Sequence, residues 1–316
     1  MSNVLNPDAP SVRVPGVTTG GVVDLSDSTL VGTNQTNSGT VNFIDGNINP
    51  AFDNPNAKKH LSEIAEANKT AAYPTQIVNL PSRGLLYPED NPLSLGYVEM
   101  KFMTAKEEDI LTTESYINQG VVLDKLFQSL IVSKIDYDTL LVGDRDAIMI
   151  AARIYGYGET YETSLTTPSG DTQKVTVDLK DIPHKPYDET MCTRGTNSFT
   201  YKTSSGDEIR FHLLTTSDQV QINKFLKKPK HGDQRDTQLT TRLFYMIDAI
   251  NGNDDKKFIK MFIENDFRAI DSRKFREHIA KIQPGIDMEI EVVDEATGIP
   301  FRAQIAIGLD FFWFNV

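Results

Sequence analysis

The sequence predicts an α+β fold with an extended N-terminal arm, a helical subdomain, and then helices with three β-hairpins. Residues 1–57 lack any sustained apolar period. Apolar residues then recur at helical spacing, and short alternating segments later flank turn-forming residues. Four parts follow: an assembly arm (1–57), a linker helix (58–75), a docking loop with a helical subdomain (76–158), and a hairpin and helix subdomain (159–316).

The arm, residues 1–57, differs in composition from the rest of the chain. It carries nine Asn, many Gly, Ser, Thr and Pro residues, and one cation, Arg13. Its apolar residues, among them Phe43 and Phe52, come in ones and twos, which is too few to build a core. We therefore expect an arm that is disordered alone and orders when it is laid across a partner, with Phe43 and Phe52 as candidate contacts.

A helix is expected from about residue 56 to residue 71, ended by Pro74. The docking loop, residues 80–88, then alternates Pro and Gly with apolar groups, as an exposed contact loop does. Its candidate interface residues are Pro81, Arg83, Leu85, Leu86 and Tyr87.

Apolar and charged residues alternate over 98–102, which predicts a strand. Thr104 with Glu107 matches a capping box at the start of a helical region, 104–156. Within it, residues 122–131 carry a strong apolar stripe. Asp144 precedes a second, mostly apolar helix that Gly156 and Gly158 end.

After residue 159 the pattern predicts hairpins over 161–179, 199–214 and 288–307. Helices are expected between them, at 216–227, 235–250, 255–264 and 272–282, the last with Asp271 as its N-cap. Four aromatic residues close the chain. They suggest a terminal strand with alternate rings in the core, or outward rings, Phe312 and Phe314, that contact a neighbouring subunit.

Composition excludes several classes of function. The net charge of −12 argues against general nucleic-acid binding. A basic cluster between Lys224 and Arg235 is read as a solvated surface, or as a patch for an acidic neighbour. No apolar run is long enough to predict membrane insertion, and the single cysteine, Cys192, excludes a site built on Cys pairs.

No catalytic motif is present, and the five histidines are far apart. Acidic pairs such as Asp144 with Asp146 could serve glycan cleavage. At a helix start, however, such acids complement the helix dipole, so we expect a protein that is not an enzyme.

Several strings of residues nevertheless resemble a known family, the baseplate hub proteins of T-even-type contractile-tailed bacteriophages. The resemblance covers roughly 76–316. It rests on the docking-loop segment 76–111, Gly120–Leu126, Asp144-Arg145-Asp146, Ala151–Gly158, Asp271–Arg276, Pro284–Asp287 and Phe311–Trp313.

The resemblance implies a structural virion protein of the tail baseplate, made in the host cytoplasm. Its partners would be other baseplate and tail subunits and copies of itself. A tail-assembly chaperone that is absent from the mature virion is one alternative, and a glycan-cleaving tail enzyme is another. The family also implies paired cysteines, like a zinc knuckle, in hairpins that here end in Thr167–Gly170 and Asp294–Gly298 without cysteine. We expect no metal and no cofactor, with Pro168, Gly170 and Gly298 shaping the turns instead.

Overall fold

The structure is a computed structural model that describes residues 55–69, 75–227, 237–306 and 308–312. The predictions on the arm, including Phe43 and Phe52, and on Phe314 lie outside the described residues. Most of the basic cluster between Lys224 and Arg235 lies outside them as well.

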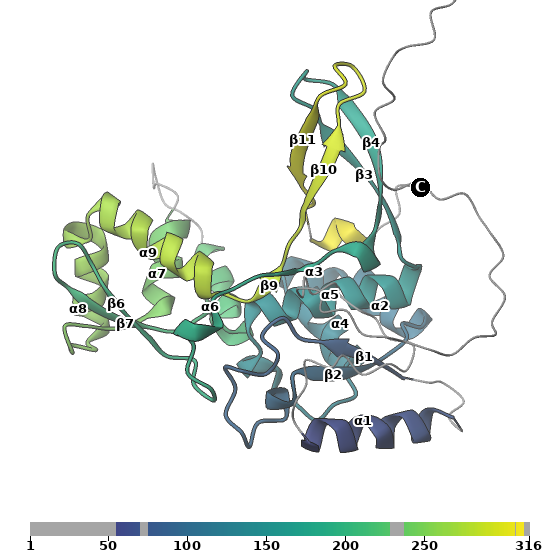
Figure 1. Ribbon diagram of the computed structural model, residues 1–316, viewed down its shortest axis with the longest axis horizontal. Coiled ribbons are helices and arrows are strands. Elements are labelled where there is room, and N and C mark those ends of the chain that lie inside the picture. The colour runs from purple at the N-terminus through teal and green to yellow at the C-terminus, as the bar shows by residue number, and fades with distance from the viewer. Residues whose placement is uncertain (1–54, 70–74, 228–236, 307, 313–316) are drawn as a thin grey trace, which may run out of the picture. The chain divides into compact units, whose positions relative to one another are not determined.

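The first described elements are a helix and a two-stranded sheet (Figure 1). Helix α1 (Pro55–Asn68) confirms the helix predicted from about residue 56. Strand β1 (Thr75–Asn79) pairs antiparallel with β2 (Tyr97–Lys101), so the predicted strand has a partner that sequence reasoning missed. A small separate core of Ala57, Ile64 and Tyr97 joins helix and sheet.

The region predicted to be helical, 104–156, contains four helices. Its helices are α2 (Ala105–Thr112), α3 (Glu114–Gln119), α4 (Val122–Leu130) and α5 (Val142–Tyr157). The stripe on α4 buries Val122, Leu126, Phe127 and Leu130. Short 3₁₀ turns cover Pro92–Leu95 and Tyr137–Thr139.

The capping box at the start of α2 is confirmed. The Glu107 carboxylate accepts from the Thr104 amide at 3.1 Å. Fully buried, it also accepts from Ser129 Oγ at 2.9 Å and pairs with Lys101 Nζ at 2.8 Å. These bonds to the ionised form outweigh desolvation and lower the pKa of Glu107 to about 2.

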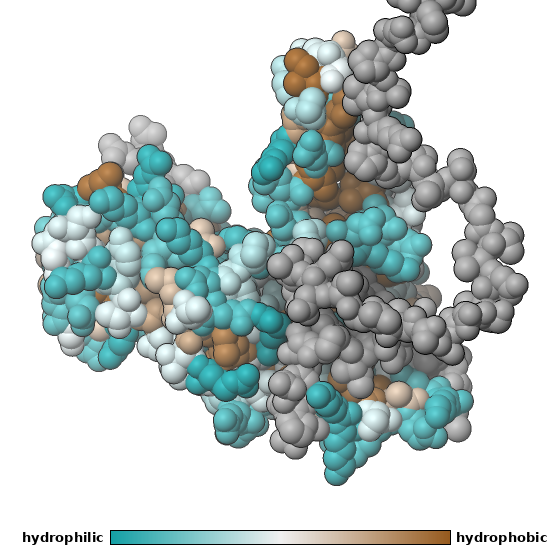
Figure 2. All heavy atoms as spheres, in the orientation of Figure 1, coloured by the Kyte–Doolittle hydropathy of each residue, from teal (hydrophilic) through white to brown (hydrophobic). Residues whose placement is uncertain are grey.

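Two of the three predicted hairpins lie side by side (Figure 1). They are β3 (Thr160–Thr166) with β4 (Thr172–Asp178), and β10 (Glu289–Val293) with β11 (Pro300–Gln304). The side-chain amide of Gln173 joins them: it donates to the Val293 carbonyl at 3.0 Å and accepts from the Glu295 amide at 3.2 Å. Figure 2 shows apolar side chains at the end of the second hairpin, where Val293 and Ile299 are exposed.

The remaining predicted hairpin, β6 (Phe199–Lys202) with β7 (Glu208–Phe211), gains a third strand, β8 (Ile247–Ile250). The prediction of a helix over 235–250 is therefore wrong at its end, because α7 (Gln238–Met246) stops where β7 offers a free edge. Ile247 and Ile250 are buried from this strand rather than from a helix face.

The other helices are α6 (Thr216–Leu226), α8 (Lys256–Met261), which continues as a π-helical turn over Phe262–Asp266, and α9 (Ala269–Ile282). The pair β5 (His184–Lys185) and β9 (Gly285–Ile286) links distant parts of the chain. Short 3₁₀ turns cover Leu179–Asp181, Glu189–Met191 and Leu309–Phe312.

Two further expectations need correction. Asp271 is not the N-cap of the last helix but lies inside its first turn, where its carboxylate accepts from the Ser204 amide at 3.0 Å and from Ser205 Oγ at 2.6 Å. The described part of the aromatic end is a 3₁₀ turn rather than a strand, and it buries both Phe311 and Phe312.

One hydrophobic cluster extends from β1 through the four helices of the helical subdomain to α9 and Phe312. Among the described residues, no helix is long and apolar enough to span a membrane.

Candidate functional site

The first turn of α5, residues Gly143 to Asp146, contacts a different segment of the chain with each residue. Gly143 packs against the strand β9, Asp144 binds the docking loop, Arg145 binds the residues before α5, and Asp146 lines a cavity. This turn contains the Asp144-Arg145-Asp146 string, whose acids the sequence suggested to be complements of the helix dipole.

Asp144 is fully buried and shapes the docking loop. Its carboxylate accepts from the Ser82 amide at 2.8 Å, from Ser82 Oγ at 2.7 Å and from the Tyr87 hydroxyl at 2.6 Å. The Tyr87 hydroxyl also accepts from the Leu141 amide at 2.9 Å. Burial raises the pKa of Asp144, although these bonds oppose the rise, and burial likewise raises the pKa of Tyr87.

Because the loop folds onto Asp144, several of its residues are not surface groups. Pro81 is buried, and Leu86 and Tyr87 are only 1% and 4% exposed. Their prediction as interface contacts does not fit this burial, which places them in the core. Phe312, predicted as an outward ring, is also buried.

The two other loop candidates remain accessible. Arg83 is exposed, has a left-handed backbone with φ of 50°, and forms an ion pair with Glu189. Leu85 is partly exposed, and its carbonyl accepts from the Gly195 amide at 2.8 Å. The surface part of the docking loop is therefore narrower than the sequence suggests.

Arg145 ties α5 to α4 and to the turn between them. Its guanidinium lies 3.1 Å from the Asp124 carboxylate, and its Nε donates to the Tyr137 hydroxyl at 3.3 Å. Tyr137 in turn donates to Asp124 at 3.0 Å. Burial raises the pKa of Tyr137 beyond its usual range, so this phenol stays protonated.

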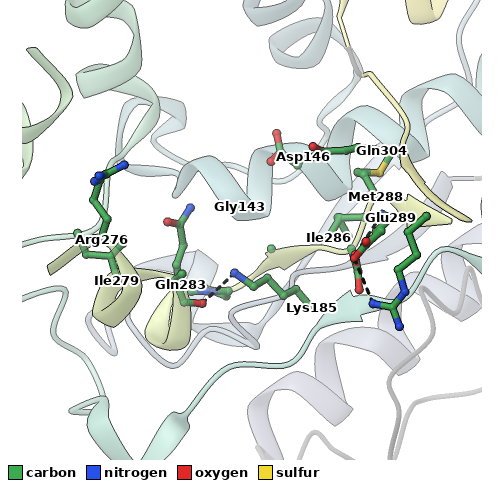
Figure 3. Close-up of a pocket in the computed structure, with 15 residues that line it drawn as sticks. Gly143, Asp146, Lys185, Arg276, Ile279, Gln283, Ile286, Met288, Glu289 and Gln304 are labelled. Atoms are coloured by element: carbon green, nitrogen blue, oxygen red, sulfur yellow. Dashed lines mark hydrogen bonds and ion pairs between the residues drawn. The ribbon is translucent and has the colours of Figure 1, made fainter. Parts of the chain in front are cut away.

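Gly143 allows α5 to approach β9 closely. A Cβ at this position would lie 2.0 Å from the Pro284 carbonyl oxygen, so no side chain fits. Beside this contact is a cavity of about 650 Å³ between α5, the end of α9 and the base of the β10–β11 hairpin. Figure 3 shows Asp146 with Gln304 toward the upper edge of this cavity, and Gln283 with Arg276 toward its left.

A second cavity, of about 670 Å³, is lined by the docking loop and by α6. His212 contacts two acids there: its Nδ1 lies 2.9 Å from Asp248 and its Nε2 lies 3.3 Å from Asp218. Burial lowers the pKa of His212, but the two carboxylates outweigh burial and raise it to about 9. The imidazolium is therefore held as a cation between two anions, which does not suit a general base.

The tips of the β3–β4 and β10–β11 hairpins contain turn-forming residues in the places where the family resemblance implied paired cysteines. Gly170 and Gly298 have φ of 93° and 71°, and the Asp294 carboxylate accepts from the Ala296 amide at 2.9 Å. Within the described ranges, no group of three or more His, Cys, Asp or Glu side chains could hold a metal ion.

Comparison with known proteins gives one result. Residues 87–313, more than half of the chain, match the model of a family described as T4 bacteriophage base plate protein. The match begins inside the docking loop and includes the Asp-Arg-Asp turn, the first cavity, the second cavity except Leu86, and all three hairpins. No curated protein and no solved structure matches the chain. This protein belongs to the T4 bacteriophage base plate protein family, as the resemblance in its sequence had indicated.

Proposed function

We propose that the protein is a structural subunit of the baseplate hub of a contractile phage tail, that it is not an enzyme, and that it acts through assembly contacts with other subunits. The observation that carries the proposal is the family match over residues 87–313. Hub rather than peripheral position rests on the resemblance of the quoted sequence strings.

The contacts would come from the arm and from the accessible residues of the docking loop, Arg83 and Leu85. The loop follows the arm in the chain, so a subunit that binds the arm is within reach of the loop. Asp144 holds the loop through three hydrogen bonds, one from the Ser82 amide and two from the Ser82 and Tyr87 hydroxyls, so these side chains are presented on a preorganised turn.

A non-enzymatic role agrees with the chemistry of the second cavity. Its histidine is already paired with two carboxylates, and in the part of the chain that the structure describes no serine or threonine hydroxyl bonds to it. Among the described residues, the second cavity therefore lacks a serine or threonine hydroxyl bonded to His212, the pair that nucleophilic acyl transfer by such a hydroxyl requires.

Quantitative mass spectrometry of purified virions tests the proposal. A fixed copy number per particle is expected, with density for residues 75–312 at the baseplate centre in a tail reconstruction. Absence from virions would instead identify an assembly chaperone. Turnover of peptidoglycan by the purified protein, lost when one acid is replaced, would identify an enzyme.

Removal of residues 1–54, which stops before α1 and its buried Ala57, tests the arm. We expect the truncated chain to keep its melting temperature and to lose incorporation into baseplates, because the arm cannot contribute a core. A truncated chain that fails to fold would contradict this division of the protein.

A further inference from the structure

The cavity beside α5 contains a carboxylate without a partner. Asp146 is partly buried, and no hydrogen bond or ion pair reaches its oxygens from any residue that the structure describes. Its neighbour Asp144, by contrast, accepts three hydrogen bonds. Asp144 and Asp146 thus stand in one helical turn, but only Asp144 has hydrogen-bond partners among the described residues.

Cations that line the cavity are already engaged elsewhere. Lys185 Nζ donates to the Ala280 carbonyl at 2.8 Å, and the Arg302 guanidinium lies 3.7 Å from the Glu289 carboxylate (Figure 3). None of these groups neutralises Asp146.

The third cation, Arg276, donates through Nε to the Ser272 carbonyl at 3.4 Å. Two amides, Gln283 and Gln304, complete the polar lining, and no hydrogen bond of their side chains is found among the described residues. Each can offer a carbonyl oxygen to a guest. Among the described residues, the cavity thus has one carboxylate without a partner and two amides that can accept, while each of its three cations is engaged through at least one nitrogen.

An unpaired carboxylate in such a place costs stability. Burial, with the Asp144 charge adding to it, raises the pKa of Asp146 to about 6 against the opposing effect of Arg145 and Arg242. At neutral pH the isolated protein therefore holds a charge that it solvates poorly. Groups kept in this condition within a cavity are candidates for binding.

We propose that this cavity receives a lysine or arginine side chain of a neighbouring protein subunit, with Asp146 as its charge partner. The inference rests on the proposed assembly function and names the chemistry of one contact. The guest supplies donors for Asp146 and for the two glutamines, and a guanidinium can bind the carboxylate with two hydrogen bonds. An anionic guest would meet cations that already have partners and a carboxylate that repels it.

Thermal melting of the full chain gives the first test. Asp146→Asn should raise the melting temperature by a few degrees at pH 8, because it removes the unpaired charge. This gain should shrink as the pH falls below 6 and vanish below about 3.8, where the aspartate is protonated in the folded and the unfolded chain alike. Asp109→Asn, at an exposed acid on α2, is the matched control and should change nothing. A lower melting temperature for Asp146→Asn at pH 8 would show a structural role and overturn the proposal.

Binding of a small probe gives the second test. Argininamide should lower the pKa of Asp146, followed by the ¹³C shift of its carboxyl, by about one unit. Citrullinamide, which has the same shape without the guanidinium charge, should leave that pKa unchanged. No response to argininamide, or an equal response to both probes, would refute charge recognition. Both measurements use the isolated chain, so they stand apart from whether the protein occurs in virions.

Discussion

Tyr87→Phe isolates the contribution of the hydrogen-bond network that shapes the docking loop. The substitution keeps the ring in the core and removes one hydroxyl, which donates to Asp144 at 2.6 Å and accepts from the Leu141 amide at 2.9 Å. Both partners are buried, and water does not readily replace the lost hydroxyl there.

The size of the effect follows from these two bonds. A hydrogen bond to a charged group contributes about 1.5–3 kcal/mol, and a buried amide left without an acceptor costs about 1–3 kcal/mol. We expect a loss of about 3 kcal/mol in the free energy of unfolding, because some relaxation recovers part of the sum. For a domain of this size, the melting temperature should fall by about 6–12 °C.

Urea denaturation followed by circular dichroism measures this loss. Tyr245→Phe is the matched control, because Tyr245 is partly buried and no hydrogen bond of its hydroxyl is found among the described residues. Its stability should stay within about 0.5 kcal/mol of the native chain. If Tyr87→Phe changes stability as little as the control does, Asp144 does not hold the loop as we argue.

Three further predictions concern stability and hairpin coupling. The folded-state pKa of His212 is about 9, above its ordinary value of 6.5. Its pairing with the two acids should therefore stabilise the fold fully below pH 6.5. Roughly 3 kcal/mol of the free energy of unfolding should be lost as the pH rises to 9, measured by denaturation at a series of pH values. Gly143→Ala should lower the free energy of unfolding by several kcal/mol in urea denaturation, since its Cβ would lie 2.0 Å from the Pro284 carbonyl oxygen. Gly285→Ala should lower it far less, because the nearest atom to its Cβ would be 3.9 Å away. Gln173→Ala should speed amide hydrogen exchange at the ends of β4 and β10 while the global melting temperature stays nearly constant.

Each of these has a clear contrary result. If the free energy of unfolding changes between pH 6.5 and pH 9 by the same amount in the native chain and in His212→Asn, the imidazolium contributes nothing to stability. Equal costs for the two glycine substitutions would show that close approach is not the reason for Gly143. Unchanged exchange after the Gln173 substitution would show that the two hairpins are held together by other contacts.

The local elements were largely predictable. Local patterns place these elements to within a few residues. The patterns are the apolar stripe at 122–131, the capping pair Thr104 and Glu107, and the turn residues of the hairpins. The end of the helix over 235–250 was not predictable, because Ile247 to Ile250 fit either a helix face or a strand. Only the presence of β7 as an edge decides between them.

The docking loop shows where reasoning from sequence alone reaches its limit. Alternating Pro, Gly and apolar residues indicate a turn-rich loop, but they do not say which side chains face outward. That choice depends on Asp144, which lies 57 residues after Tyr87 in the chain and draws its hydroxyl inward. Leu86 and Tyr87 consequently belong to the core, and Arg83 and Leu85 remain accessible.

By itself, the sequence determined the α+β class, the position of most helices and hairpins, and membership in a phage baseplate family, because these depend on local periodicity and on residue strings. The tertiary structure alone decided the surroundings of Asp144 and Asp146. Both acids stand in the same helical turn, and a local pattern cannot tell them apart. Their difference arises from segments distant in sequence: the docking loop satisfies Asp144 with three donors, while the lining of the cavity leaves Asp146 without one.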